Sequence, residues 1–301
     1  MLQIKKSSKT KLHLIVSGMH LVKEFGYTIN DIKEDGWKIN EQIEHLISSD
    51  SPSAIAKSIG IGIISFAEVF KRFTPDILII MGDRYEMLSA VIAAQPFGIL
   101  IAHIHGGEIT VGAIDDVFRH SITKMSNLHF VSTKSYYNRV VQMGENPKSV
   151  FISGAPALDN IVNKKFKKKM ILNFNLNKKF LICTYHPETR NFKNVIKETK
   201  EFIKGLKYFE HDIIFTAPNS DTKGLKVAQL IEDEVKKNSK WHYFKNLGIE
   251  NYYNALTHAY AMIGNSSSGI IEAASFNLPV INVGERQKGR ERSSNVYDIP
   301  C

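Results

Sequence analysis

Residues 76–108 read DILIIMGDRYEMLSAVIAAQPFGILIAHIHGGE, and this stretch decides the fold class. Its first part, 76–81, is a short run of branched apolar residues that is typical of a buried strand. Residues 84–95 have the length and composition of a helix, which Pro96 and Gly98 end. A second apolar run follows at once. Strand, helix and strand in this order predict a parallel βαβ unit, with polar side chains collected after the strands.

The same alternation continues on both sides of this stretch. Residues 11–18 form an apolar run that ends in a turn, and 53–73 carry apolar residues at helical spacing. Strands and helices then alternate through 115–156 and through the second half of the chain. We therefore predict an α/β protein of two Rossmann-type parallel-sheet domains. The lysine-rich run 164–169 marks the boundary, which gives an N-terminal domain of 1–163 and a C-terminal domain of 164–301.

Composition narrows the functional classes. The chain has 301 residues, 43% of them hydrophobic and 23% charged, which fits a globular protein with a substantial core. Its net charge is +9, but no basic stripe interleaved with aromatic residues indicates nucleic-acid binding. The positive field suits an anionic small substrate. The two cysteines make no disulfide framework. We expect a cytoplasmic protein with no membrane span and no nucleic-acid partner.

Residues 102–124, AHIHGGEITVGAIDDVFRHSITK, concentrate ionisable side chains. Strand alternation puts His103 and His105 on one face with Glu108 nearby, an arrangement compatible with a metal site. The ligand set is partial, because zinc sites use three or four ligands. Core histidines and an acid–base site are the alternatives. The adjacent Asp115 and Asp116 favour the acid–base site, since neighbouring carboxylates can separate into an ionised and a protonated member.

Further polar groups follow other predicted strands. GNSSSG, 264–269, is the strongest phosphate-binding signal, because serine hydroxyls and backbone amides precede a helix expected to begin at about Gly269. Glu272 lies on the first turn of that helix, where a carboxylate can bind ribose hydroxyls. Each position has a structural alternative, such as helix capping or a solvated loop. The other strand-end groups are Asp83 and Arg84 in GDRYE, His186 in HPETR, Asn219 and Asp221 in PNSD, and Arg286 in GERQKGRER. Arg119 is spaced to pair with Asp115 along the helix that the acidic pair opens.

Taken in order from about Ser17 to Arg292, these motifs resemble the UDP-N-acetylglucosamine 2-epimerase family. The resemblance is strongest to its hydrolysing branch, which makes N-acetylmannosamine for bacterial sialic acid synthesis. The matching stretches are GMHL, GDRYE, HIHGGE, IDD-FRHSITKMS-LHFVST, GAPALDNI, HPET, GNSSSGIIE and INVGERQKGR.

The resemblance implies a GT-B-like fold, in which two Rossmann-type domains face each other across a cleft. It implies that UDP leaves C1 as a proton leaves C2, giving a 2-acetamidoglucal. Water then adds with inversion at C2 and releases N-acetylmannosamine. The chemistry implied needs no metal and no other cofactor. Family members are usually homo-oligomers, and we expect the same of this chain.

The resemblance also assigns roles to individual positions. Some relatives carry Glu at the position of His105, and Glu108 is then expected to take that acid role. The residues expected to be catalytic are Asp83, Glu108, Asp115 and Asp116, which would transfer protons, and His186, which would help UDP to leave. The residues expected to bind the UDP-sugar are Arg84, His105, Arg119, Asn219, Asp221, Ser266, Ser267, Ser268, Glu272 and Arg286.

Three alternatives to this function stay open. A related branch hydrolyses and epimerises UDP-diacetylbacillosamine, although HIHGGE and GNSSSG favour the N-acetylglucosamine branch. A GT-B chain can also bind a UDP-sugar without turnover, and a metal-dependent hydrolase is the third. Against the family pattern, the chain starts near the second strand and stops at Cys301. We therefore expect it to lack the first strand of the N-terminal sheet and the last helices of the C-terminal domain.

Overall fold

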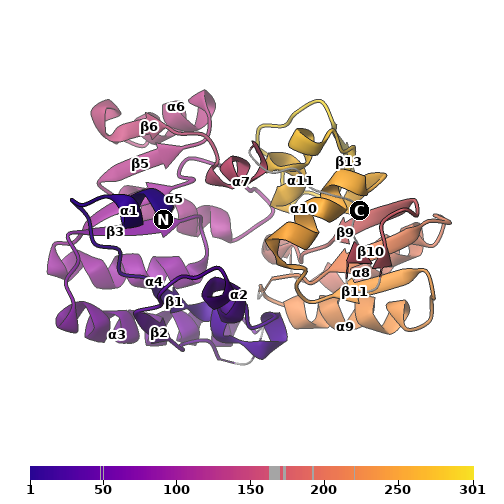
Figure 1. Cartoon of the computed structure of the whole chain (residues 1–301), viewed down its shortest axis with the longest axis horizontal. Helices are drawn as coiled ribbons and strands as arrows, with labels where there is room; N and C mark the ends of the chain where they lie inside the picture. Colours follow the sequence, from indigo (N-terminus) through magenta and orange to yellow (C-terminus); the bar gives the residue numbers. More distant parts are fainter. Residues whose placement is uncertain (48, 50, 163–169, 172–173, 192, 220) are drawn as a thin grey trace.

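The computed structural model describes residues 1–301 except 48, 50, 163–169, 172–173, 192 and 220. The predicted domain boundary at 163/164 and the lysine-rich run lie outside the described residues. Figure 1 shows two α/β halves side by side, the N-terminal one in indigo to magenta and the C-terminal one in orange to yellow. The prediction of an α/β protein with parallel sheets in both halves is confirmed.

The N-terminal half contains two separate parallel sheets. Strands β3 to β6 pair in sequence order, and β1 pairs with β2. The strands are β1 (Ile15–Ser17), β2 (Glu41–Ile43), β3 (Ile77–Met81), β4 (Leu100–Ile104), β5 (Leu128–Val131) and β6 (Val150–Ile152). The helices are α1 (Leu2–Lys6), α2 (Ile29–Glu34), α3 (Pro52–Arg72), α4 (Tyr85–Ala94), α5 (Asp115–Lys124), α6 (Lys134–Gln142) and α7 (Asp159–Val162).

The core of this half lies on one face of the β3–β6 sheet. Ile80 and Ile101 point to that face and pack with Phe66 and Phe70 of α3. The other face presents apolar side chains to solvent, namely Ile77, Ile79, Met81, Leu100 and Phe151. By length and composition alone, α3 is apolar enough to cross a membrane, with a mean hydropathy of 1.5 over 18 residues. Its inner side chains instead contribute to this core.

The C-terminal half is built on one six-stranded parallel sheet in the order β11-β10-β9-β12-β13-β14. This is the Rossmann order, in which ligands bind where the strand order reverses, here between β9 and β12. Its elements are β7 (Met170–Ile171), β8 (Phe174–Asn175), β9 (Phe180–Thr184), β10 (Asp212–Thr216), β11 (Trp241–Phe244), β12 (Ala261–Gly264), β13 (Val280–Val283), β14 (Val296–Ile299), α8 (Val195–Leu206), α9 (Gly224–Val235), α10 (Gly248–His258) and α11 (Ser267–Ile271). Two apolar clusters, one on each face of this sheet, form its core.

Candidate active site

His186 and Asn265 meet at the point where the strand order reverses. His186 follows β9, and Asn265 follows β12, the neighbouring strand. The side-chain amide of Asn265 accepts the His186 N–H at 2.7 Å and donates to the His186 carbonyl at 2.8 Å. Both backbone groups of His186 are therefore fixed by one side chain. Asn265 belongs to the GNSSSG motif, but no local sequence signal assigns it this role.

The His186 ring is held in one orientation and stays uncharged. Its Nδ1 accepts the backbone N–H of Asn219 at 3.2 Å. Burial lowers the pKa of His186 to about 3, and the positive charge of Arg286 acts in the same direction. At neutral pH the ring can donate a hydrogen bond through Nε2, but it is a poor base.

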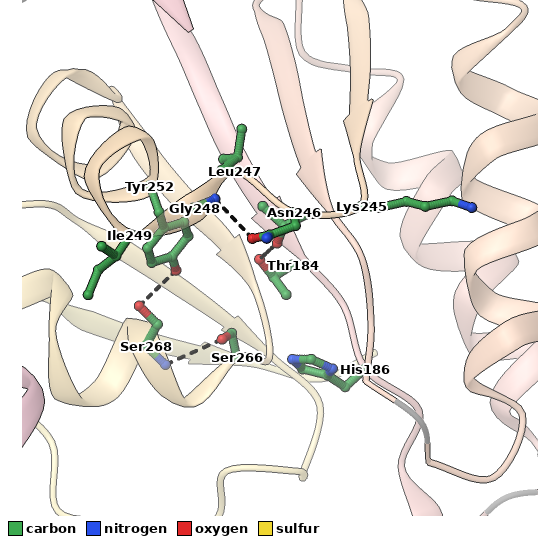
Figure 2. Close-up of a pocket in the computed structure, with 11 residues that line it drawn as sticks. Thr184, His186, Lys245, Asn246, Leu247, Gly248, Ile249, Tyr252, Ser266 and Ser268 are labelled. Atoms are coloured by element: carbon green, nitrogen blue, oxygen red, sulfur yellow. Dashed lines mark hydrogen bonds between the residues drawn. The ribbon is translucent and has the colours of Figure 1, made fainter. Parts of the chain in front are cut away.

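A cavity of about 370 Å³ opens beside His186. Figure 2 shows His186 and Ser266 on one side of it and Leu247–Ile249 with Tyr252 on the other. The Ser268 hydroxyl accepts a hydrogen bond from Tyr252 at 2.7 Å, and Ser266 accepts the Ser268 N–H at 3.3 Å. Hydroxyl and amide donors therefore line one wall, as an anionic ligand requires.

The helix after the serines differs from the prediction in its start. It begins at Ser267, two residues before the expected Gly269, because Ser266 caps it. Glu272 consequently follows the last residue of α11 and does not lie on its first turn. Its carboxylate accepts a hydrogen bond from Tyr253 at 2.8 Å. Ser266 and Ser268 line the cavity described above.

Two arginines and two aspartates form a buried charged cluster beside the cavity. Arg84 from the N-terminal half makes an ion pair with Asp221 from the C-terminal half. Arg84 Nη1 also lies 3.7 Å from Asp115 Oδ1, and Arg286 Nη2 lies 3.6 Å from Asp221 Oδ2. The cluster therefore joins Asp115, which is predicted to transfer protons, to residues that are predicted to bind the substrate.

Asp115 is the least satisfied carboxylate of this cluster. It is 4% exposed, and neither of its side-chain oxygens has a hydrogen-bond partner among the described residues. Burial and the negative charge of Asp221 raise its pKa to about 6, against the attraction of Arg84. Burial also opposes the ionisation of Asp221, but Arg84 and Arg286 outweigh it and hold the pKa of Asp221 low. The proton that the pair can carry near neutral pH therefore belongs to Asp115.

Asp116 and Asp83 belong to a second group, centred on Arg119. The Arg119 guanidinium is 1% exposed and makes an ion pair with Asp83. It also lies 3.5 Å from Asp116, whose carboxylate accepts the Thr110 N–H at 2.7 Å. The predicted pairing of Arg119 with Asp115 is therefore wrong, because Asp115 faces Arg84. The two adjacent aspartates therefore have different environments. Asp115 belongs to the charged cluster, and Asp116 holds the loop that contains Thr110.

His105 and Glu108 form a hydrogen-bonded pair at the end of β4. His105 Nδ1 lies 2.7 Å from Glu108 Oε1, and Arg290 Nη1 lies 2.8 Å from Glu108 Oε2. Burial opposes ionisation of Glu108, but its bonds to His105 and its ion pair with Arg290 lower its pKa overall. Of the basic residues in GERQKGRER, Arg286 reaches the charged cluster and Arg290 reaches Glu108.

His103 is a core residue. It is fully buried, with Nε2 2.8 Å from the Gly82 carbonyl and Nδ1 3.1 Å from the Thr123 hydroxyl. His105 turns away from the strand at φ 69°, so the expected shared face of the two histidines is not formed. Within the described ranges, no group of three His, Cys, Asp or Glu side chains could hold a metal ion.

Hydrogen bonds and one close backbone contact hold the two halves together beside these clusters. The Val111 N–H donates to the Lys288 carbonyl at 3.0 Å, and the Ile114 N–H donates to the Thr189 hydroxyl at 2.7 Å. At Gly112, an added Cβ would lie 2.7 Å from the Arg286 Cα. A glycine is required there because the loop of Arg286 passes this closely.

Gly112→Ala is expected to hold the two halves apart and to lower kcat/KM about 10²-fold, since small misplacements of reacting groups cost that much. The affinity of the cavity beside His186 for an anionic ligand, measured by calorimetry, should change far less. The matched control is Gly205→Ala in α8, where an added Cβ meets nothing within 4 Å. If Gly112→Ala is as active as the control, activity does not require the two halves to meet this closely.

Comparison with known proteins agrees with this geometry. The family model described as UDP-N-acetylglucosamine 2-epimerase matches residues 2–300. The chain belongs to this family. A relative from Campylobacter jejuni, named GDP/UDP-N,N'-diacetylbacillosamine 2-epimerase (hydrolyzing), is 41% identical over 98% of this chain and 78% of its own. One from Legionella pneumophila, named UDP-N,N'-diacetylbacillosamine 2-epimerase (hydrolyzing), is 38% identical over 99% of this chain and 79% of its own.

Solved structures of the UDP-N-acetylglucosamine 2-epimerase family share the fold of this chain. The crystal structure of the Neisseria meningitidis enzyme bound to UDP-GlcNAc has a TM-score of 0.74 at 16% identity and covers 93% of this chain and 77% of its own. The GT-B-like arrangement expected from the sequence is therefore confirmed. The chain is a member of a family of UDP-sugar 2-epimerases, and the roles of its individual residues stay predictions.

Proposed function

We propose that this protein is a hydrolysing 2-epimerase whose substrate is UDP-N,N'-diacetylbacillosamine. The observation that carries the choice of sugar is the 41% identity to the Campylobacter jejuni enzyme named for it, with 38% to the Legionella enzyme in support. The N-acetylglucosamine substrate expected from HIHGGE and GNSSSG becomes the second candidate. It is favoured by the description of the matching family and by the Neisseria structure.

In this proposal the nucleotide occupies the cavity between the serine loop and residues 245–249. Ser266 and Ser268 donate to the diphosphate, and Arg286 neutralises its charge as the C1–O bond breaks. The Arg84–Asp221 ion pair lies next to this position. We assign Arg84 to the diphosphate from the N-terminal side of the cleft, with its guanidinium already positioned by Asp221.

The proposed reaction needs two proton carriers. One removes the C2 proton while UDP leaves with the electrons of the C1–O bond, which creates the C1=C2 double bond. The other returns a proton to C2 from the opposite face as water adds to C1, and the 2-epimerised free sugar is released. Asp115 suits the second role, because its raised pKa leaves a protonated fraction near neutral pH.

The test is a comparison of nucleotide sugars. We expect kcat/KM for UDP-N,N'-diacetylbacillosamine to exceed that for UDP-GlcNAc by about 10–100-fold, the discrimination that a few pocket contacts provide. UDP release is followed by a coupled assay and the free sugar by NMR. Turnover of the GDP-linked sugar measures how strictly the enzyme selects the uracil nucleotide over the guanine nucleotide. Preference for UDP-GlcNAc would select the second candidate, and UDP binding without any turnover would leave a non-catalytic binding protein.

A further inference from the structure

The groups available for the C2 proton differ in how fully their lone pairs are used. Asp83 is engaged by Arg119, and Asp116 by Arg119 and the Thr110 N–H. Glu108 accepts from His105 and Ser132 on Oε1 and from Arg290 on Oε2, and its side chain is 3% exposed. Each of these carboxylates is held by an arginine, and Glu108 has partners on both of its oxygens.

His105 differs from these carboxylates, because its ring keeps a basic nitrogen that no described arginine holds. Its Nδ1 is bound to Glu108, so the neutral ring carries its proton there and its lone pair on Nε2. Among the residues that the structure describes, Nε2 has no hydrogen-bond partner, and the side chain is 16% exposed. A histidine oriented by a carboxylate at one nitrogen and open at the other is the arrangement of a general base.

The backbone indicates that this orientation is constrained. His105 has φ 69°, a left-handed conformation that is unfavourable for a non-glycine residue. Its N–H donates to the Phe130 carbonyl at 3.0 Å, which holds the residue in that conformation. Gly107, two residues on, packs so closely on the Tyr136 carbonyl that an added Cβ would lie 2.6 Å from it. The turn therefore aims the ring at Glu108.

We propose that His105 is the base that removes the C2 proton, with Glu108 and Arg290 as positioning residues for it. This reverses the roles expected from the sequence, and it rests on the proposed function. The Nε2 lone pair takes the proton, the C2–H electrons form the C1=C2 bond, and UDP leaves with the C1–O electrons. Glu108 stabilises the imidazolium, and Arg290 keeps Glu108 ionised. Arg290 lies on the same loop as Arg286, so the half that binds the nucleotide also supplies the arginine that positions Glu108 beside His105.

The charged surroundings of His105 set the direction of the pH effect. Glu108 lies on the same loop, Arg290 comes from the C-terminal half, and Arg119 and Arg139 bind the carbonyls of Glu108 and Gly107. His103, on β4, is neutral because burial lowers its pKa to about 4. Removing the Glu108 charge therefore leaves an excess of positive neighbours and takes away the carboxylate that stabilises a positively charged His105 ring.

The test uses His105→Asn, because asparagine tolerates positive φ and preserves the turn. We expect kcat to fall about 10²–10⁴-fold, the contribution of a general base, with unchanged UDP affinity by calorimetry and unchanged Tm. Glu108→Gln should lower kcat less, leave KM unchanged, and move the acid limb of the kcat/KM profile to lower pH. His258→Asn, at the end of α10, is the histidine control and should keep wild-type activity.

The outcomes separate this inference from the proposed function. If the wild type turns over a UDP-sugar and His105→Asn keeps more than a tenth of its kcat, the inference fails alone. An acid limb that stays in place in Glu108→Gln also overturns it, because a purely structural Glu108 would not move that limb. If the wild type binds UDP but turns over no nucleotide sugar, the proposed function fails and this inference fails with it.

Discussion

Asp115→Asn is expected to lose about 10³-fold in kcat and, at the same time, to raise the free energy of unfolding at pH 8. The loss of activity follows from the removal of a proton donor, which is worth 10²–10⁴-fold. The gain in stability follows from the environment of the carboxylate. Asp115 is buried, with no hydrogen-bond partner in the described part of the chain, and ionising it in the folded state is unfavourable.

The direction of this stability change follows from the pKa of Asp115, which the fold raises to about 6 from its ordinary value of 3.8. Between these values the folded protein holds the proton more tightly than the unfolded chain does, so wild-type stability falls as pH rises through this window. Above pH 6 this loss of stability is complete. The free energy of unfolding of the asparagine variant should then exceed that of the wild type by on the order of 1–3 kcal/mol. Below pH 4 the two should unfold alike.

Urea denaturation at pH 4 and pH 8 measures this difference. Asp116→Asn is the matched control, since Asp116 accepts the Thr110 N–H and lies near Arg119 and Arg190. That variant should lose stability at pH 8, in the opposite direction to Asp115→Asn. If both variants are destabilised equally, Asp115 is a structural residue like its neighbour, and its proposed role in proton transfer is wrong.

Arg84→Ala is expected to have the largest effect on stability. It removes the cation that lies among Glu86, Asp115 and Asp221 and leaves their charges uncompensated in a buried site. Because the Arg84 side chain is 22% exposed, we expect a loss of about 2–4 kcal/mol, toward the lower part of the range for broken buried pairs. Contact between the two halves should weaken too, since Asp221 belongs to the other half.

The pH dependence of this variant provides its own check. Arg84 holds the pKa of Asp221 low, so its contribution is present above the ordinary carboxylate pKa and is lost as pH falls through the folded value. The difference from wild type should therefore be largest near pH 7 and shrink toward pH 3. Arg72→Ala removes a surface ion pair with Glu41, and its cost should stay within about 1 kcal/mol. Equal losses in the two variants would contradict the buried cluster.

Much of the fold could be predicted from the sequence, because its strands are short branched apolar runs bounded by turn residues. The predicted strand at 76–81 became β3 within one residue, and the predicted strand at 99–107 became β4, which already ends at Ile104. β14 was missed, because Tyr297 and Ile299 are exposed and the strand is defined by its pairing with β13. The β1–β2 pair was missed as a separate sheet, since pairing depends on contacts between strands and not on local pattern.

The candidate site could be predicted as a set of strand-end motifs, but not as a set of pairs. Strand order brings GNSSSG next to HPETR, and this follows from the sheet topology. Sequence spacing favoured Asp115 as the partner of Arg119, whereas the structure gives Arg119 to Asp83 and Asp116. Arg290 reaching Glu108 depends on how the two halves meet, which no local sequence signal contains.

The loop 285–292 limits how this protein can be recombined with its relatives. It belongs to the C-terminal half by sequence, yet Gly289 packs on Ile109 and Arg290 pairs with Glu108 of the N-terminal half. A chimera joined between the halves would combine a loop and a receiving surface from different parents. The two segments that meet here, residues 105–112 and 285–292, therefore have to come from the same parent in any chimera between family members.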